Sequence, residues 1–141
     1  MELCTGGELL QRCTAGGNHS ERSVASYLRA VLRTLAQCHA KGIIHRDVKP
    51  ENFVFQSDEE GAPLKAIDFG IAIFFDPGAL PIKDLNPEGT PWYLAPEVCR
   101  GRVLPASDVW AAGVMAAYLL TGHYPFIDRA RPDRPDLAAT L

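Results

Sequence analysis

The sequence lacks the features that mark nucleic-acid-binding and membrane-spanning proteins. Its 14 Lys and Arg residues are outnumbered by 17 Asp and Glu residues, so the formal net charge is −3 and no basic excess indicates a nucleic-acid partner. The longest apolar stretch covers residues 109–120, a length that suits a buried helix and is too short to cross a bilayer. We therefore expect neither nucleic-acid binding nor a membrane span.

Cysteine pairs and targeting signals are also absent. None of the 4 cysteines belongs to a CxxC pair, so buried, reduced thiols are favoured over a zinc or redox site. The first four residues, Met-Glu-Leu-Cys, have neither the charged nor the apolar region of a secretory leader. We expect an intracellular, cytoplasmic protein, with the nucleus left open as an alternative.

The remaining composition is that of a globular domain. Apolar residues make up 47% of the chain and charged residues 22%, so the sequence is not that of a disordered segment. With 141 residues, the chain can bury about two thirds of the surface that it exposes when unfolded. Length and composition alone are therefore compatible with one folded domain.

Hydrophobic spacing predicts a helix and a hairpin in the first half of the chain. Apolar residues recur at helical spacing over residues 20–40, with Ser20 as the N-cap and Gly42 as the stop. Short β-favouring runs follow at residues 43–44, 53–55 and 64–67, and the last two are joined by a polar turn.

The second half is predicted to be a long loop, a buried helix and a tail. Residues 74–96 contain five prolines, which favours a loop. Residues 108–120 are predicted to form a helix that ends at Gly122, and residues 127–141 show weak periodicity, as in a frayed tail. We divide the chain into a main unit, 1–126, and a divergent tail, 127–141.

The most informative segment is residues 45–52, whose sequence is HRDVKPEN. An aspartate, a lysine two residues later and an asparagine five residues later can converge from one loop. Together they supply a proton acceptor, a cation that pairs with phosphate and an amide ligand for a metal ion. Any one of these residues alone would carry little information, but the complete string does.

This stretch resembles the catalytic loop of eukaryotic protein kinases, and further motifs of that family follow in order. Residues 68–70 (DFG) match the magnesium-binding motif, residues 95–97 (APE) match the end of the activation segment, and residues 108–110 (DVW) match the start of a central helix. Residues 1–8 (MELCTGGE) resemble the hinge between the two lobes. Lys49 matches the serine/threonine version of the catalytic loop, and the sequence of the hinge segment resembles that of calcium-dependent and calmodulin-dependent kinases.

The resemblance implies roles for individual residues. Asp47 would orient the acceptor hydroxyl and take its proton late, and Lys49 would stabilise charge on the transferred phosphoryl group. Asn52 and Asp68 would hold the Mg²⁺ ions that bridge the ATP phosphates. The implied nucleotide-binding residues are Glu2, Cys4, Glu8, Glu51, Asn52, Val54 and Asp68.

Several of these residues have a purely structural alternative. Asp68 could be an ordinary turn former, and His45 is expected to pack and to form hydrogen bonds. Asp108 could be an N-cap of the helix that it opens, whereas the family resemblance implies that it braces the backbone of the catalytic loop. Arg46 would meet a negative charge, which we expect Asp84 or Glu88 to supply in place of a phosphate.

The resemblance implies an α+β fold that is mostly α: the C-terminal lobe of a protein kinase, with a small β-hairpin at the cleft and without the N-terminal lobe. The surfaces that such a lobe leaves open could mediate association, and Glu97 would be costly to bury without a partner. The implied function is transfer of the ATP γ-phosphate to Ser or Thr hydroxyls of a protein substrate. The alternatives are a catalytically deficient, truncated kinase-like binding module and a fragment of a longer kinase.

Overall fold

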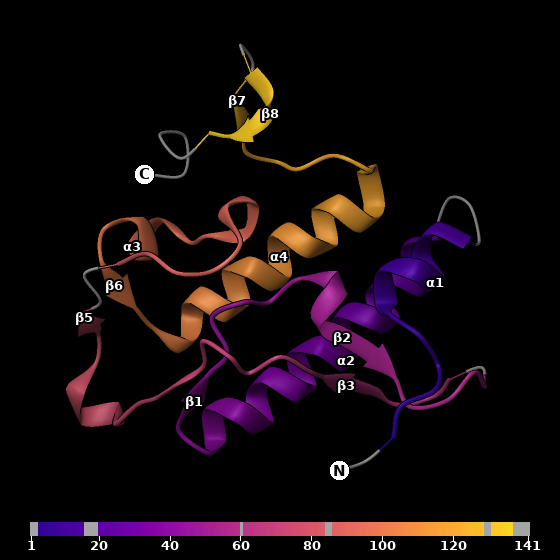
Figure 1. Cartoon of the computed structure of the whole chain (residues 1–141), viewed down its shortest axis with the longest axis horizontal. Helices are drawn as coiled ribbons and strands as arrows, with labels where there is room; N and C mark the ends of the chain where they lie inside the picture. The colour runs from indigo at the N-terminus through magenta and orange to yellow at the C-terminus, as the bar shows by residue number, and fades with distance from the viewer. Residues whose placement is uncertain (1–2, 16–19, 60, 84–85, 129–130, 137–141) are drawn as a thin grey trace.

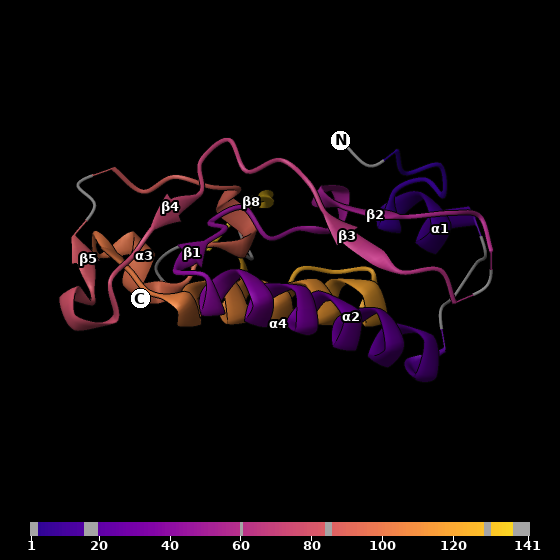
Figure 2. The same ribbon diagram turned by 90° about the horizontal axis from the view of Figure 1, so that it is seen from below.

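The structure of the chain is a computed structural model, in which residues 3–15, 20–59, 61–83, 86–128 and 131–136 are described. Two long helices form its base and lie side by side, as both views show (Figures 1 and 2). They are α2 (Glu21–Ala40) and α4 (Pro105–Thr121). The short strands and loops lie on one side of this helix pair (Figure 2).

Helix α2 begins and ends where the sequence predicts. The Ser20 hydroxyl accepts a hydrogen bond from the backbone N–H of Ser23 and so satisfies one donor of the first turn. At the other end the N–H of Lys41 donates to carbonyls of the last turn, and Gly42 follows with a φ of 70°. Val24, Val31 and Leu35 form the buried face, so the helical spacing correctly identified the core side.

Helix α4 begins three residues before the predicted start, at Pro105. Pro105 needs no hydrogen-bond partner for its nitrogen, and the hydroxyl of Ser107 accepts the N–H of Leu104 at 3.3 Å. Asp108 therefore lies inside the first turn, and its interpretation as an N-cap is wrong. Gly122, with a φ of 73°, ends the helix as predicted.

Four two-stranded antiparallel sheets complete the described structure. The predicted hairpin is confirmed, with Phe53 opposite Ala66 and Phe55 opposite Leu64. The pairs are β1 (Ile43–Ile44) with β4 (Ile73–Phe74), β2 (Phe53–Phe55) with β3 (Leu64–Ala66), β5 (Ile82–Lys83) with β6 (Arg102–Val103), and β7 (Ile127–Asp128) with β8 (Arg131–Pro135).

The remaining elements are short, and most were not predicted. The 74–96 segment is mainly loop, as expected, and two single 3₁₀ turns interrupt it. Beyond residue 126, the β7–β8 ribbon replaces part of the tail that weak periodicity had indicated; the division of the chain at residue 126 stays a prediction. The short helical elements are α1 (Leu9–Ala15), α3 (Pro96–Cys99), η1 (Pro50–Asn52), η2 (Pro77–Ala79) and η3 (Pro91–Tyr93).

The core joins α1, α2, the β2–β3 hairpin and α4. Leu9, Leu35, Phe53 and Met115 are at most 1% exposed and belong to one hydrophobic cluster. Cys13 packs in the same cluster, and its burial raises the pKa of its thiol to about 11. All 4 cysteines are free, as predicted. Among the described residues, no helix is both long and apolar enough to span a membrane.

Replacing Leu35 with Ala should destabilise the fold by about 2–5 kcal/mol, because its side chain is 1% exposed and its removal leaves a cavity in the core. Leu32 on the same helix is 37% exposed, so Leu32→Ala is the matched control and should cost less than about 1 kcal/mol. Urea unfolding measures both free energies. Equal losses would show that the α2–α4 interface is not the main core.

Candidate active site

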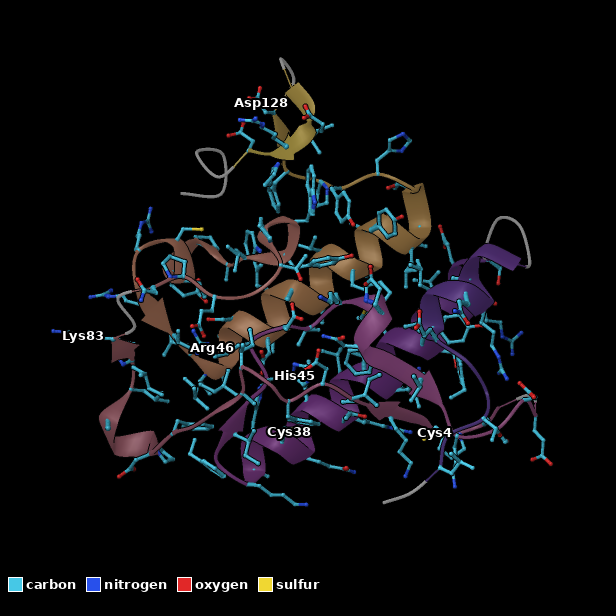
Figure 3. All side chains as sticks on the ribbon, viewed as in Figure 1. Cys4, Cys38, His45, Arg46, Lys83 and Asp128 are labelled. Atoms are coloured by element: carbon cyan, nitrogen blue, oxygen red, sulfur yellow. The ribbon has the colours of Figure 1, made fainter. Side chains whose placement is uncertain are left out.

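The loop of residues 45–49 connects β1 to η1, and the side chain of His45 anchors its start. This side chain is fully buried. Its Nε2–H donates to the carbonyl of Ile67 at 3.1 Å, and its Nδ1 accepts the N–H of Asp47 at 3.3 Å. Its ring also lies 4.8 Å from that of Phe69. The expectation that His45 packs and forms hydrogen bonds is confirmed, and Figure 3 shows it at the centre of the molecule.

Asp108 fixes the backbone at the start of this loop. Its carboxylate is 1% exposed and accepts the N–H groups of His45 and Arg46, each at 2.9 Å. The ring of His39, from the end of α2, lies 2.8 Å from the same carboxylate. Arg46 adopts a φ of 70°, a left-handed conformation that is costly for a residue with a side chain. Asp108 thus braces the loop, as the family resemblance implied.

Asp47 and Lys49 are brought together by the loop, and Thr90 joins them from a distant segment. The Lys49 ammonium lies 2.9 Å from Asp47 Oδ2 and donates to the Thr90 hydroxyl at 2.9 Å. Thr90 in turn donates its hydroxyl proton to Asp47 Oδ1 at 2.7 Å. The amide of Asn52 donates to Asp47 Oδ2 at 2.9 Å and to the Asp47 carbonyl at 2.8 Å. Both carboxylate oxygens are therefore oriented.

The pKa of Asp47 reflects two opposing effects. Partial burial alone would raise it, but the hydrogen bonds from Lys49, Thr90 and Asn52 and the charge of Lys49 outweigh burial and lower it. Asp47 therefore stays ionised at neutral pH and is a weak base. A weak, well-oriented base suits a reaction in which the proton leaves the nucleophile late.

Asn52 and Asp68 offer oxygen atoms but are not joined by any described contact. The Asn52 amide nitrogen is used within the loop, which leaves its amide oxygen as the end available to a ligand. Asp68 is exposed, has a φ of 59°, and accepts the N–H of Gly70 at 3.2 Å. The N–H of Ile67 donates to the Asn52 carbonyl at 2.9 Å, so Asp68 follows a residue that is tied to the loop. This donor set fits Mg²⁺, which prefers carboxylate and amide oxygens.

The segment that resembles the hinge lies along β2. Gly6 donates its N–H to the Phe55 carbonyl at 3.0 Å, and Glu8 forms a bridge to Val54. These contacts place Glu8 beside Val54, and Figure 3 shows Cys4 apart from His45 and Arg46. Their nucleotide-binding roles stay predictions. Glu2, the other predicted hinge residue, lies outside the described residues.

Glu51 differs from the other loop residues because its carboxylate faces an aromatic cluster. This cluster comprises Trp92, Tyr93, Tyr118 and Tyr124, whose rings stack or meet edge to face. The Oε2 atom of Glu51 is buried and has no hydrogen-bond partner among the described residues. Its charge contributes to a raised pKa of Tyr93 and Tyr118, in each case after burial as the first cause.

Contacts with Arg46 hold the segment between the DFG and APE motifs. Arg46 lies 3.2 Å from Glu88, as expected for one of its two predicted partners, and Asp84 lies outside the described residues. Gly89 has a φ of 120°, and a side chain there would meet the Arg46 carbonyl at 2.7 Å.

The Glu97 carboxylate, in the APE motif, accepts a hydrogen bond from the hydroxyl of Ser107 at 2.7 Å. Glu97 is thus half-buried with a partner, and no pattern in the sequence predicts this contact with Ser107.

The fold and this arrangement are those of a protein kinase domain fragment with mixed α and β structure. The family model described as the protein kinase domain matches residues 1–137, and the chain belongs to this family. It is 49% identical to calcium-dependent protein kinase 34 of Arabidopsis thaliana and 48% identical to calcium-dependent protein kinase 16 of Oryza sativa subsp. japonica, each over 126 residues and 89% of the chain. These matches cover 24% and 22% of the two relatives, so the chain spans about a quarter of their length.

Asp108→Ala should destabilise the protein by about 3 kcal/mol or more, because two backbone N–H groups of the loop lose their acceptor in a buried position. His39→Ala removes only one of the three hydrogen bonds of Asp108 and should cost about 0.5–1.5 kcal/mol. Chemical denaturation compares the two variants. A loss as large for His39→Ala would show that the side-chain pair, not the loop backbone, carries the stabilisation.

Proposed function

We propose that this chain is the C-terminal-lobe part of a protein serine/threonine kinase, which transfers the ATP γ-phosphate to Ser or Thr hydroxyls of a protein. The observation that carries the proposal is the Asp47 carboxylate, which Lys49, Asn52 and Thr90 orient on both oxygens. The names of the similar proteins from plants support kinase activity, and the calcium-dependent type is a proposal for this chain.

Each residue of the cluster has a part in this proposal. Asp47 accepts a hydrogen bond from the acceptor hydroxyl, orients it toward the phosphate and takes its proton late. The Lys49 ammonium, held 2.9 Å from both Asp47 and Thr90, neutralises charge on the phosphoryl oxygens. Asn52 and Asp68 would hold Mg²⁺ ions, which supply charge neutralisation at the ATP phosphates when bound.

The preference for Ser and Thr over Tyr is proposed from the contact between Lys49 and Thr90. Thr90 reaches Asp47 both with its hydroxyl and with its backbone N–H, at 2.7 Å and 3.2 Å. These hydrogen bonds bring the segment that contains Thr90 next to the base, and we propose that this arrangement suits the short side chain of an aliphatic hydroxyl. The adenine contacts of Cys4, Glu8 and Val54 belong to the same proposal, and the protein is proposed to act in the cytoplasm.

The test is phosphoryl transfer from radiolabelled ATP and Mg²⁺ to a Ser-containing peptide by the purified protein and by its Asp47→Asn variant. Loss of the base should lower the rate about 10²–10⁴-fold, the usual contribution of a positioned acid or base. Asp133→Asn is the control, because Asp133 is exposed and contacts only Arg134 among the described residues, at 4.0 Å; it should leave the rate unchanged. Equal background in wild type and Asp47→Asn would favour a binding module instead.

We further propose that Glu88 supplies the negative charge for Arg46 without phosphorylation. Thr90 and Tyr93 are the only hydroxyl-bearing residues between Asp68 and Glu97. Phosphatase treatment should therefore leave the rate unchanged, while Glu88→Ala should lower it several-fold, because the Arg46 side chain is only 6% exposed and loses its ion pair. Mass spectrometry that locates an essential phosphate on Thr90 or Tyr93 would contradict this proposal.

A further inference from the structure

A basic groove lies at the end of the molecule opposite β5 and β6, remote from the Asp47 cluster. It is bounded by α1, residues 22–33 of α2 and the turn that joins β2 to β3, which lie near one another in both views (Figures 1 and 2). Its volume is about 640 Å³. Four of its lining residues are arginines, and no described lining residue is Asp or Glu. In a chain with a net charge of −3, this is a local concentration of positive charge. The four are Arg12, Arg22, Arg29 and Arg33.

Arg12 shows which chemical groups this groove accepts. Its guanidinium lies 4.1 Å above the ring of Phe55 and donates to the carbonyl of Ser57 at 3.0 Å. It also reaches the carbonyl of Glu59 at 3.5 Å and lies 3.9 Å from the Asp58 carboxylate. Two backbone carbonyls and one carboxylate from the acidic turn at residues 57–59 therefore contact the arginine at one end of the groove. Peptide carbonyls and carboxylates are thus the groups that its arginine recognises.

Within the described part of the chain, the other three arginines have no such partner. Arg22, Arg29 and Arg33 are exposed and form no ion pair with an acidic side chain of the described residues. Their spacing of seven and four residues places them on one face of α2. Three guanidinium groups in a row repel one another unless an anion lies between them. The groove therefore has unused capacity for negative charge.

The floor of the groove is apolar, which favours a peptide over a nucleic acid. Tyr27, Ala30, Phe55, Ala62 and Leu64 line the groove beside the arginines, and Phe55 and Leu64 are buried. The ring of Tyr27 meets that of Phe55 edge to face at 5.7 Å. These rings are used in packing against each other, so they do not present stacked, open faces for nucleobases. Small apolar side chains of an extended peptide suit such a floor.

We propose that this groove is a docking site for an acidic, extended protein segment. At 1.5 Å per residue, the three arginines are separated along α2 by roughly 10 Å and 6 Å. An extended peptide rises about 3.3 Å per residue and presents every second side chain on the same face, so acidic residues four and then two positions apart face the arginines together, at separations of roughly 13 Å and 7 Å that the long Arg and Glu side chains can span. Apolar residues between the acidic ones contact the floor. The site is independent of Asp47, and its occupancy does not require phosphoryl transfer.

The test is fluorescence anisotropy of a labelled octapeptide with three glutamates, spaced four and two residues apart and separated by Ala and Leu. The purified protein should bind it, and binding should weaken as NaCl rises from 50 to 300 mM. Arg29→Glu combined with Arg33→Glu should raise Kd at least tenfold. The matched control is Lys83→Glu combined with Arg102→Glu, two exposed cations that face each other on β5 and β6 and should change Kd less than twofold.

A second peptide with glutamine in place of each glutamate should bind at least tenfold more weakly. Far-ultraviolet circular dichroism of the charge-reversed variants confirms that α2 still folds. Unchanged affinity after reversal of Arg29 and Arg33 would overturn the proposal, and so would equal binding of the glutamine peptide. Equal affinity for single-stranded DNA of eight nucleotides would also overturn it, because the groove would then be a general polyanion site.

Discussion

The rest of the site depends on one buried carboxylate, that of Asp108 at the start of α4. It accepts hydrogen bonds from two backbone N–H groups of the loop that carries Asp47, and so makes α4, with its buried face, a rigid support for that loop. The left-handed conformation of Arg46 is affordable only with such a support, since it is unfavourable on its own. The hydrogen bonds to Asp108 thus offset the backbone strain at Arg46 and satisfy the buried carboxylate. They also fix the backbone from which the side chains of Asp47 and Lys49 project.

A second constraint is that the site is assembled by polar contacts between distant parts of the sequence. Asp47 and Thr90 are 43 residues apart in the sequence, and the neighbouring residues Arg46 and Glu88 meet between the same two segments. Gly89 permits the close approach of these two segments because a side chain there would collide with the Arg46 carbonyl. The hydrophobic core positions the helices, whereas these few hydrogen bonds define the chemistry.

The sequence predicted best where several local signals coincide. For α2, apolar spacing, the Ser20 cap and Gly42 agreed, and both ends were correct within one residue. The start of α4 was missed because Pro105 and the hydroxyl of Ser107 complete its first turn without a conventional N-cap. Strands β4 and β6 are two residues long, too short for any periodicity to reveal them. The loop of Asp47 was recognisable because its residues are contiguous, whereas the arginine groove draws on residues 12–33 and the turn before β3, which no local pattern connects.

The long connection between β4 and α3 has a consequence for the integrity of the protein. The described part of residues 75–89 contains no helix longer than a single 3₁₀ turn, and this stretch is the covalent link between the half of the molecule that holds Asp47 and the half that holds Thr90. A protease that cuts this stretch would leave both hydrophobic halves associated through α2 and α4. The nicked protein would therefore stay compact but lose the covalent link that brings Thr90 to Asp47. The amount of folded protein in a sample would then exceed the amount that has an intact site.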